Sequence, residues 1–66
     1  MPEPVQELLQ YFEYQHLPEE LQRVSMPFCD LANKVANELP NNSQLHYSLS
    51  RLLEAKDGAV RAALLR

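Results

Sequence analysis

The spacing of apolar positions along the chain predicts two long helices. In the first of them, apolar side chains recur every three or four residues, which is the period of a helix that buries one stripe. This stripe contains Leu17, Leu21, Val24, Phe28, Leu31, Val35 and Leu39. We therefore predict a helix over residues 18–39.

Prolines mark the limits and the middle of that helix. Pro18 suits a first helical turn, where the following two acids favour the positive end of the helix dipole, and Pro40 ends the segment. Pro27 lies inside, where it removes one backbone hydrogen bond and crowds the preceding turn. We expect a kink or a short break near residues 23–26.

The second long helix is predicted over residues 43–65. It follows a turn at residues 40–42, and Asn42 or Ser43 can cap it. Gly58 interrupts it at a cost of about 1 kcal/mol relative to alanine, so we favour the close approach of another backbone there over room for a ligand. Two helices joined by a short turn form an antiparallel hairpin. The apolar set is Leu45, Leu49, Leu52, Leu53, Ala59, Val60, Ala63 and Leu64.

The residues before the hairpin form a shorter amphipathic segment. We predict a short N-terminal helix within residues 1–16. The fold class is then all-α, with one domain over residues 1–66 built as an antiparallel helical hairpin with that short helix. One side of the short helix holds Val5, Leu8, Leu9 and Phe12, and the other holds Gln6, Gln10 and Glu13.

The length of the chain indicates that it needs help to be stable. A core of 66 residues seldom supplies more than a few kcal/mol without disulfides, a metal or self-association. Cys29 is the single cysteine and is interpreted as a small buried hydrophobe, while His16, Cys29 and His46 lack the paired spacings of zinc sites. We expect a homo-oligomer, without metal or cofactor.

The charge is uneven along the chain. The net charge is -3, with residues 1–42 acidic and residues 43–66 slightly basic. An acidic chain argues against duplex DNA or RNA as a partner, whereas a small anion needs only one or two cations. The first residues have no basic segment followed by an apolar run, and no run approaches a membrane span. We expect a cytoplasmic protein that does not bind membranes.

Aromatic and basic residues are the candidates for chemistry. Tyr11 and Tyr14 are three residues apart, hence neighbours on one helical face, and bases stack on such rings for about 1 to 3 kcal/mol each. The candidate cations are Arg51, Lys56 and Arg61, and the planar fork of an arginine can hold a phosphate at two points. The alternative is that the rings cover the hairpin or another subunit and that the cations lie on a solvated face. A hairpin offers no catalytic cleft within one subunit, so we expect no enzyme.

Three stretches together resemble a known family. In order they are Tyr11-Phe12-Glu13-Tyr14-Gln15-His16-Leu17-Pro18, Val24-Ser25-Met26-Pro27-Phe28-Cys29-Asp30-Leu31-Ala32 and Leu52-Leu53-Glu54-Ala55-Lys56-Asp57-Gly58-Ala59-Val60-Arg61-Ala62. This set is similar to the helical-hairpin domain of phage anti-CBASS and anti-Thoeris cyclic-nucleotide sponges. The resemblance covers residues 11–62.

The resemblance implies a symmetric assembly, typically a hexamer, that sequesters cyclic oligonucleotides in the host bacterial cytoplasm. One class of pocket in such sponges lies between subunits and takes a cyclic dinucleotide, with a tyrosine on a base and a lysine on phosphate; Tyr11 fits the tyrosine. Met26 stands where many relatives carry the lysine, which weakens the expected phosphate grip. A second class of pocket takes a cyclic trinucleotide through arginines of the last helix, a role that fits Arg61.

The sequence therefore predicts a phage or prophage sponge that binds cyclic di- or trinucleotides without cleaving them and so blocks anti-phage signalling. The alternative is a small helical oligomer that binds another protein through residues 11–18 and has no nucleotide ligand. The candidate ligand-binding residues are Tyr11, Tyr14, Met26, Phe28, Lys56 and Arg61.

Overall fold

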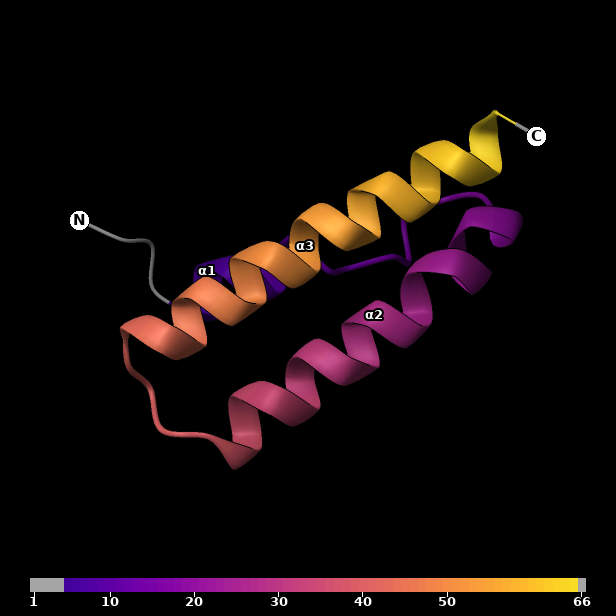
Figure 1. The fold of residues 1–66 in the computed structure, drawn as a ribbon. Coiled ribbons are helices and arrows are strands. Elements are labelled where there is room, and N and C mark those ends of the chain that lie inside the picture. Colours follow the sequence, from indigo (N-terminus) through magenta and orange to yellow (C-terminus); the bar gives the residue numbers. More distant parts are fainter. Residues whose placement is uncertain (1–4, 66) are drawn as a thin grey trace.

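The computed structural model describes residues 5–65, and in that part of the chain the secondary structure is entirely helical. The helices are α1 (Val5–Gln10), α2 (Glu19–Glu38) and α3 (Ser43–Leu64). α2 and α3 run antiparallel as a hairpin, and α1 packs against both of them (Figure 1). None of these helices is long and apolar enough to cross a membrane. The predicted all-α hairpin is confirmed for these residues.

The first helix is shorter than the sequence pattern predicts. A helix within residues 1–16 is expected, but α1 ends at Gln10, and residues 1–4 lie outside the described part. The amides of Tyr11, Phe12 and Glu13 donate to carbonyls three residues back, at 3.1, 3.1 and 3.2 Å. Such bonds tighten and close the end of a helix, and the chain must then reverse to enter α2.

The connection after α1 is tied to the start of α2. The Gln22 side-chain amide donates to the Leu17 carbonyl at 2.8 Å, and Pro18 takes the N-cap position. α2 then continues through Pro27 as one helix, so the alternative of a break near residues 23–26 is wrong. Because Pro27 has no N–H, the carbonyl of Arg23 loses its helical partner without ending the helix.

The turn between the long helices is closed by a side-chain cap. The Asn42 carboxamide oxygen accepts a hydrogen bond from the Leu45 amide at 3.0 Å. This bond satisfies one of the amides that the first turn of a helix leaves unpaired. Of the two predicted candidates, Asn42 and not Ser43 is the cap.

The core lies where all three helices meet. Its fully buried apolar side chains are Leu8, Phe12, Ala32, Leu45 and Leu49. On α2, the residues with no exposed surface are the small ones, Ser25 and Ala32, rather than the large residues of the predicted stripe. Small side chains on the contact line let α2 approach α3 closely. The large residues therefore flank the line, and Leu31 and Leu39 are about half exposed, at 47% and 51%.

The hairpin has two broad faces that differ in what covers them. α1 and residues 11–18 lie on one, which we call the back face; in Figure 1, α1 lies behind α3, and the segment after it passes behind α3 and the gap between α3 and α2. The opposite side, turned toward the viewer, is the front face. Among the described elements none packs on the front face.

Candidate functional site

A pocket lies on the back face where the segment after α1 passes over α3. It has a volume of 230 Å³, and we call it the Tyr11 pocket. A neighbouring pocket of 390 Å³, the Leu8 pocket, shares Tyr11, Lys56 and Asp57 and extends along α1. The Tyr11 pocket is lined by Tyr11, Glu13, His16, Leu17, Lys56, Asp57, Val60 and Arg61.

Two adjacent aromatic residues have opposite environments beside this pocket. Phe12 has no exposed surface and belongs to the core, whereas 52% of Tyr11 is exposed. The closing turn after Gln10 sets these orientations, because it directs one ring into the hairpin and the other over α3. Tyr11 therefore presents an accessible ring whose position is fixed by its buried neighbour.

Lys56 supplies a positive charge at the wall shared by both pockets. Its ammonium group lies 3.0 Å from the carboxylate of Asp57, and only 12% of the lysine side chain is exposed. A partly buried ammonium of this kind retains less of its hydration and interacts more strongly with an anion than a free surface lysine does. An incoming phosphate would compete with Asp57 for this group.

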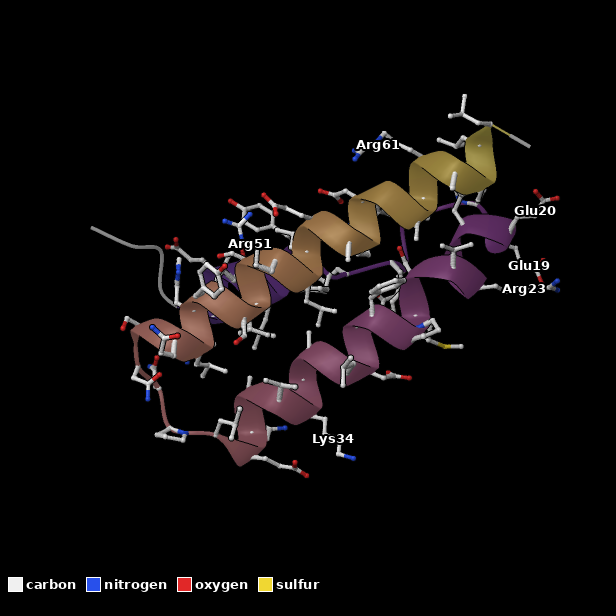
Figure 2. All side chains as sticks on the ribbon, viewed as in Figure 1. Glu19, Glu20, Arg23, Lys34, Arg51 and Arg61 are labelled. Atoms are coloured by element: carbon white, nitrogen blue, oxygen red, sulfur yellow. The ribbon has the colours of Figure 1, made fainter. Side chains whose placement is uncertain are left out.

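Arg61 is the second cation of the Tyr11 pocket. Its side chain projects from α3 on the side away from α2 (Figure 2) and forms no ion pair with any residue from 5 to 65. A methyl group added at Gly58 would meet only its guanidinium nitrogen Nη2, at 3.9 Å. Close approach of another backbone at Gly58 is therefore wrong within this chain, and the glycine leaves open space beside Arg61.

The structure brings together three of the six predicted site residues. Tyr11, Lys56 and Arg61 line one pocket. Phe28 packs instead against the hydrophobic core, and Met26 is exposed on α2 outside both pockets. Tyr14 is half-buried in the connection and does not line either pocket.

Sequence reasoning missed three polar members of the site, Glu13, His16 and Asp57. His16 and Glu13 line the Tyr11 pocket because the connection after α1 folds back over α3. Their positions depend on where the short helix ends, which the apolar pattern does not reveal. The proximity of His16 to the aromatic cluster in sequence is the signal that could have found it.

Other polar features of the described residues fit a ligand site less well. A hollow of 680 Å³ at the open end of the hairpin has no aromatic wall, and its Arg23 is paired with Glu19 at 3.3 Å. Arg51 stacks on Tyr47 at 5.1 Å from the ring centre and pairs with Glu54 at 2.8 Å. No group of three potential metal ligands occurs within residues 5–65.

Comparison of the chain with protein-family models, with curated proteins and with solved structures finds no match. The likeness to cyclic-nucleotide sponges is therefore an expectation drawn from the three sequence stretches. A functional argument has to rest on the pocket itself.

Proposed function

We propose that the chain binds cyclic oligonucleotides at the Tyr11 pocket without cleaving them, and so acts as a sponge for these messengers in the bacterial cytoplasm. The observation that carries the proposal is the exposed Tyr11 ring beside Lys56 and Arg61. A base stacks on a tyrosine ring for about 1 to 3 kcal/mol, and phosphate binds ammonium and guanidinium groups.

The phosphate contact falls to a different lysine from the one that the family resemblance implies. Met26 has no charge and lies outside both pockets, whereas Lys56 belongs to both. Because the two pockets share Tyr11 and Lys56, a ligand with two bases around a phosphate ring can occupy both. This geometry favours a cyclic dinucleotide over a single mononucleotide.

A sponge needs many copies and a stable assembly, and we propose a homo-oligomer such as a hexamer. The small core supports self-association, since five fully buried apolar residues stabilise 66 residues only weakly. A phage or prophage that makes such a protein would lower the free messenger concentration and keep host effectors inactive.

Calorimetric titration with a panel of cyclic di- and trinucleotides tests the binding. We expect saturable binding to at least one of them, and about 5- to 150-fold weaker binding by Tyr11→Ala, the range that corresponds to 1 to 3 kcal/mol. Tyr47→Ala is the matched control, because Tyr47 is equally exposed but lies on α3 outside both pockets. Absence of binding to every nucleotide would refute the proposal.

A second pair of variants separates the phosphate contact from overall charge. Arg61→Gln should weaken binding and reduce its salt dependence, whereas Arg23→Gln removes the same charge from α2 and should leave binding unchanged. Chromatography of the ligand after prolonged incubation should recover it intact. A cleaved product would contradict the proposed role as a sponge.

The alternative function is a helical module that binds another protein. It would bind through residues 11–18, where Tyr11 is 52% exposed. The two functions separate in cells: a sponge should restore phage growth in a host that signals through cyclic nucleotides, and Tyr11→Ala should abolish this effect while Tyr47→Ala does not.

A further inference from the structure

The front face of the hairpin carries an apolar surface that no described element covers. On α2, Val24, Phe28, Leu31 and Val35 follow a spacing of four, three and four residues, which aligns them along one side of the helix. Leu31 is 47% exposed, and the other three are half-buried. Phe28 and Val35 contact the core on their inner side only.

α3 contributes the other half of this surface, with smaller side chains. Leu52, Ala55, Ala59 and Ala62 follow a spacing of three, four and three residues along α3. Ala55 and Ala62 lie on the opposite flank of α3 from Leu53 and Asp57, beside which α1 packs, and Leu52 and Ala59 lie between the two flanks. None of these eight front-face residues is charged, so the surface is a ridge of large side chains beside a shallower strip of small ones.

We propose that a second copy of this chain packs on the front face, with α2 of each copy lying on α3 of the other. A two-fold axis parallel to the helices produces this arrangement, because it exchanges the two helices across the interface. It places the large α2 ridge against the small α3 strip in both halves of the contact. The interface is therefore self-complementary in shape.

The charges on α2 disfavour the other face-to-face arrangement. Helical spacing places Glu20 and Glu38 on the outer border of α2's front side. Packing α2 on α2 would instead bring the acidic borders together, and repulsion between like charges disfavours that alternative.

The area of the face suits a stable contact. The described fold extends 36 × 17 × 16 Å, so one long face has a flat projection of about 600 Å² before its side-chain relief is counted. A standard interface buries about 800 Å² of accessible surface per partner.

Sedimentation of the intact chain at micromolar concentration tests the proposal. We expect the unmodified chain to sediment as a dimer or a multiple of it, and Leu31→Glu and Ala55→Glu to sediment as monomers because each buries a charge in the contact. Asn37→Glu is the matched control: it adds the same charge at an exposed α2 position away from the front face and should keep the assembly.

Circular dichroism distinguishes loss of the interface from loss of the fold. A helical Leu31→Glu monomer supports the proposal, whereas a monomeric unmodified chain, or an unchanged mass for both Leu31→Glu and Ala55→Glu, overturns it. If Leu31→Glu is unfolded, Ala55→Glu decides, because an exposed alanine contributes little to the hairpin itself.

Cross-linking tests the orientation. In a Cys29→Ser background, an equimolar mixture of Leu31→Cys and Ser48→Cys copies should oxidise to a mixed disulfide dimer, since these two positions lie at matching heights across the proposed interface. Asn37→Cys in place of Leu31→Cys should give none. Failure of the first pair to cross-link would overturn the parallel two-fold arrangement.

Discussion

The two faces of the hairpin are built from the same pair of helices but differ in polarity and cover. The back face holds α1 and the Tyr11 pocket, whose charged or ionisable lining includes Lys56, Arg61, Asp57, Glu13 and His16. The apolar residues of the front face have charged residues only at their borders, and no described element lies over them. Under the two proposals above, this small hairpin binds a small anion on one side and a second copy of itself on the other.

The difference arises from how α2 meets α3. The contact line uses the small residues Ser25 and Ala32, and large apolar residues fall on both sides of it. On the back, Leu8 and Phe12 cover this line and complete the core. On the front, nothing in the described chain has that role, so the face can gain stability only from a partner.

Phe12→Ala should disrupt the packing on the back face and have the largest effect on the free energy of unfolding. It empties a fully buried aromatic site and removes the ring that attaches the α1 segment to the hairpin. We expect a loss of about 3 to 5 kcal/mol in the free energy of unfolding, measured by denaturant titration. Tyr11→Ala, which removes the exposed neighbouring ring, should cost less than about 1 kcal/mol. Equal losses for the two variants would mean that the faces are not organised as described.

Asn42→Ala should destabilise the whole hairpin rather than one face of it, because Asn42 caps α3 at the turn that joins the two long helices. We expect a loss of about 1 kcal/mol in the free energy of unfolding. Asn41→Ala is the control, since the Asn41 side chain forms no hydrogen bond with the described residues. A change in ligand binding or in mass at concentrations where Asn42→Ala is folded would contradict this view of the turn.

Ser25→Ala tests the contact line between α2 and α3, which separates the two faces. The Ser25 hydroxyl is buried without a hydrogen-bond partner in residues 5–65, and an unsatisfied buried hydroxyl is destabilising. We expect the variant to be more stable by up to about 1 kcal/mol. Asn37→Ala, at an exposed α2 position away from the front face, should gain only the helix propensity of alanine, about 0.5 kcal/mol. A destabilised Ser25→Ala would show that the hydroxyl has a favourable role.

The smallest expected effect on stability comes from Cys29, and it depends on pH. Partial burial, followed by the nearby carboxylate of Asp30, raises the pKa of its thiol, although a hydrogen bond from Asn33 opposes the shift. Alkylation by iodoacetamide should therefore reach its half-maximal rate at a higher pH in the folded chain than in urea. Because the unfolded chain loses the thiol proton first, stability should fall as pH rises above about 8.5, the ordinary thiol pKa. An alkylation midpoint below the one in urea would contradict this assignment.

Much of the fold could be predicted from apolar spacing. The two long helices, the turn and the cap follow from period and from local residue preferences, which act over a few neighbours. The residues of α2 that are fully buried could not be predicted in this way. The hydrophobic period points to large residues such as Leu31, whereas the close packing of the helices buries the small residues Ser25 and Ala32. Early termination of α1 also depends on tertiary reversal rather than on the amphipathic pattern.

The candidate site was only partly accessible from the sequence. Tyr11, Lys56 and Arg61 can be selected by residue type, but their meeting in one pocket depends on the path of residues 11–18 over α3. Phe28 and Met26 are separated from that pocket because they lie on α2, whose inner side faces the core. Residues that were grouped by sequence motif are therefore not all close together in the structure.

The brevity of α1 has a thermodynamic consequence for any ligand. A helix of six residues is unstable alone, so the docked position of Tyr11 depends on the burial of Leu8 and Phe12 against the hairpin. The pocket is thus one state of a docking equilibrium, and its apparent dissociation constant is the intrinsic value divided by the docked fraction. If α1 were docked in one tenth of the molecules, the apparent affinity would be about tenfold weaker than the intrinsic one. Substitutions far from the Tyr11 ring can therefore change ligand affinity by changing the docked fraction of α1.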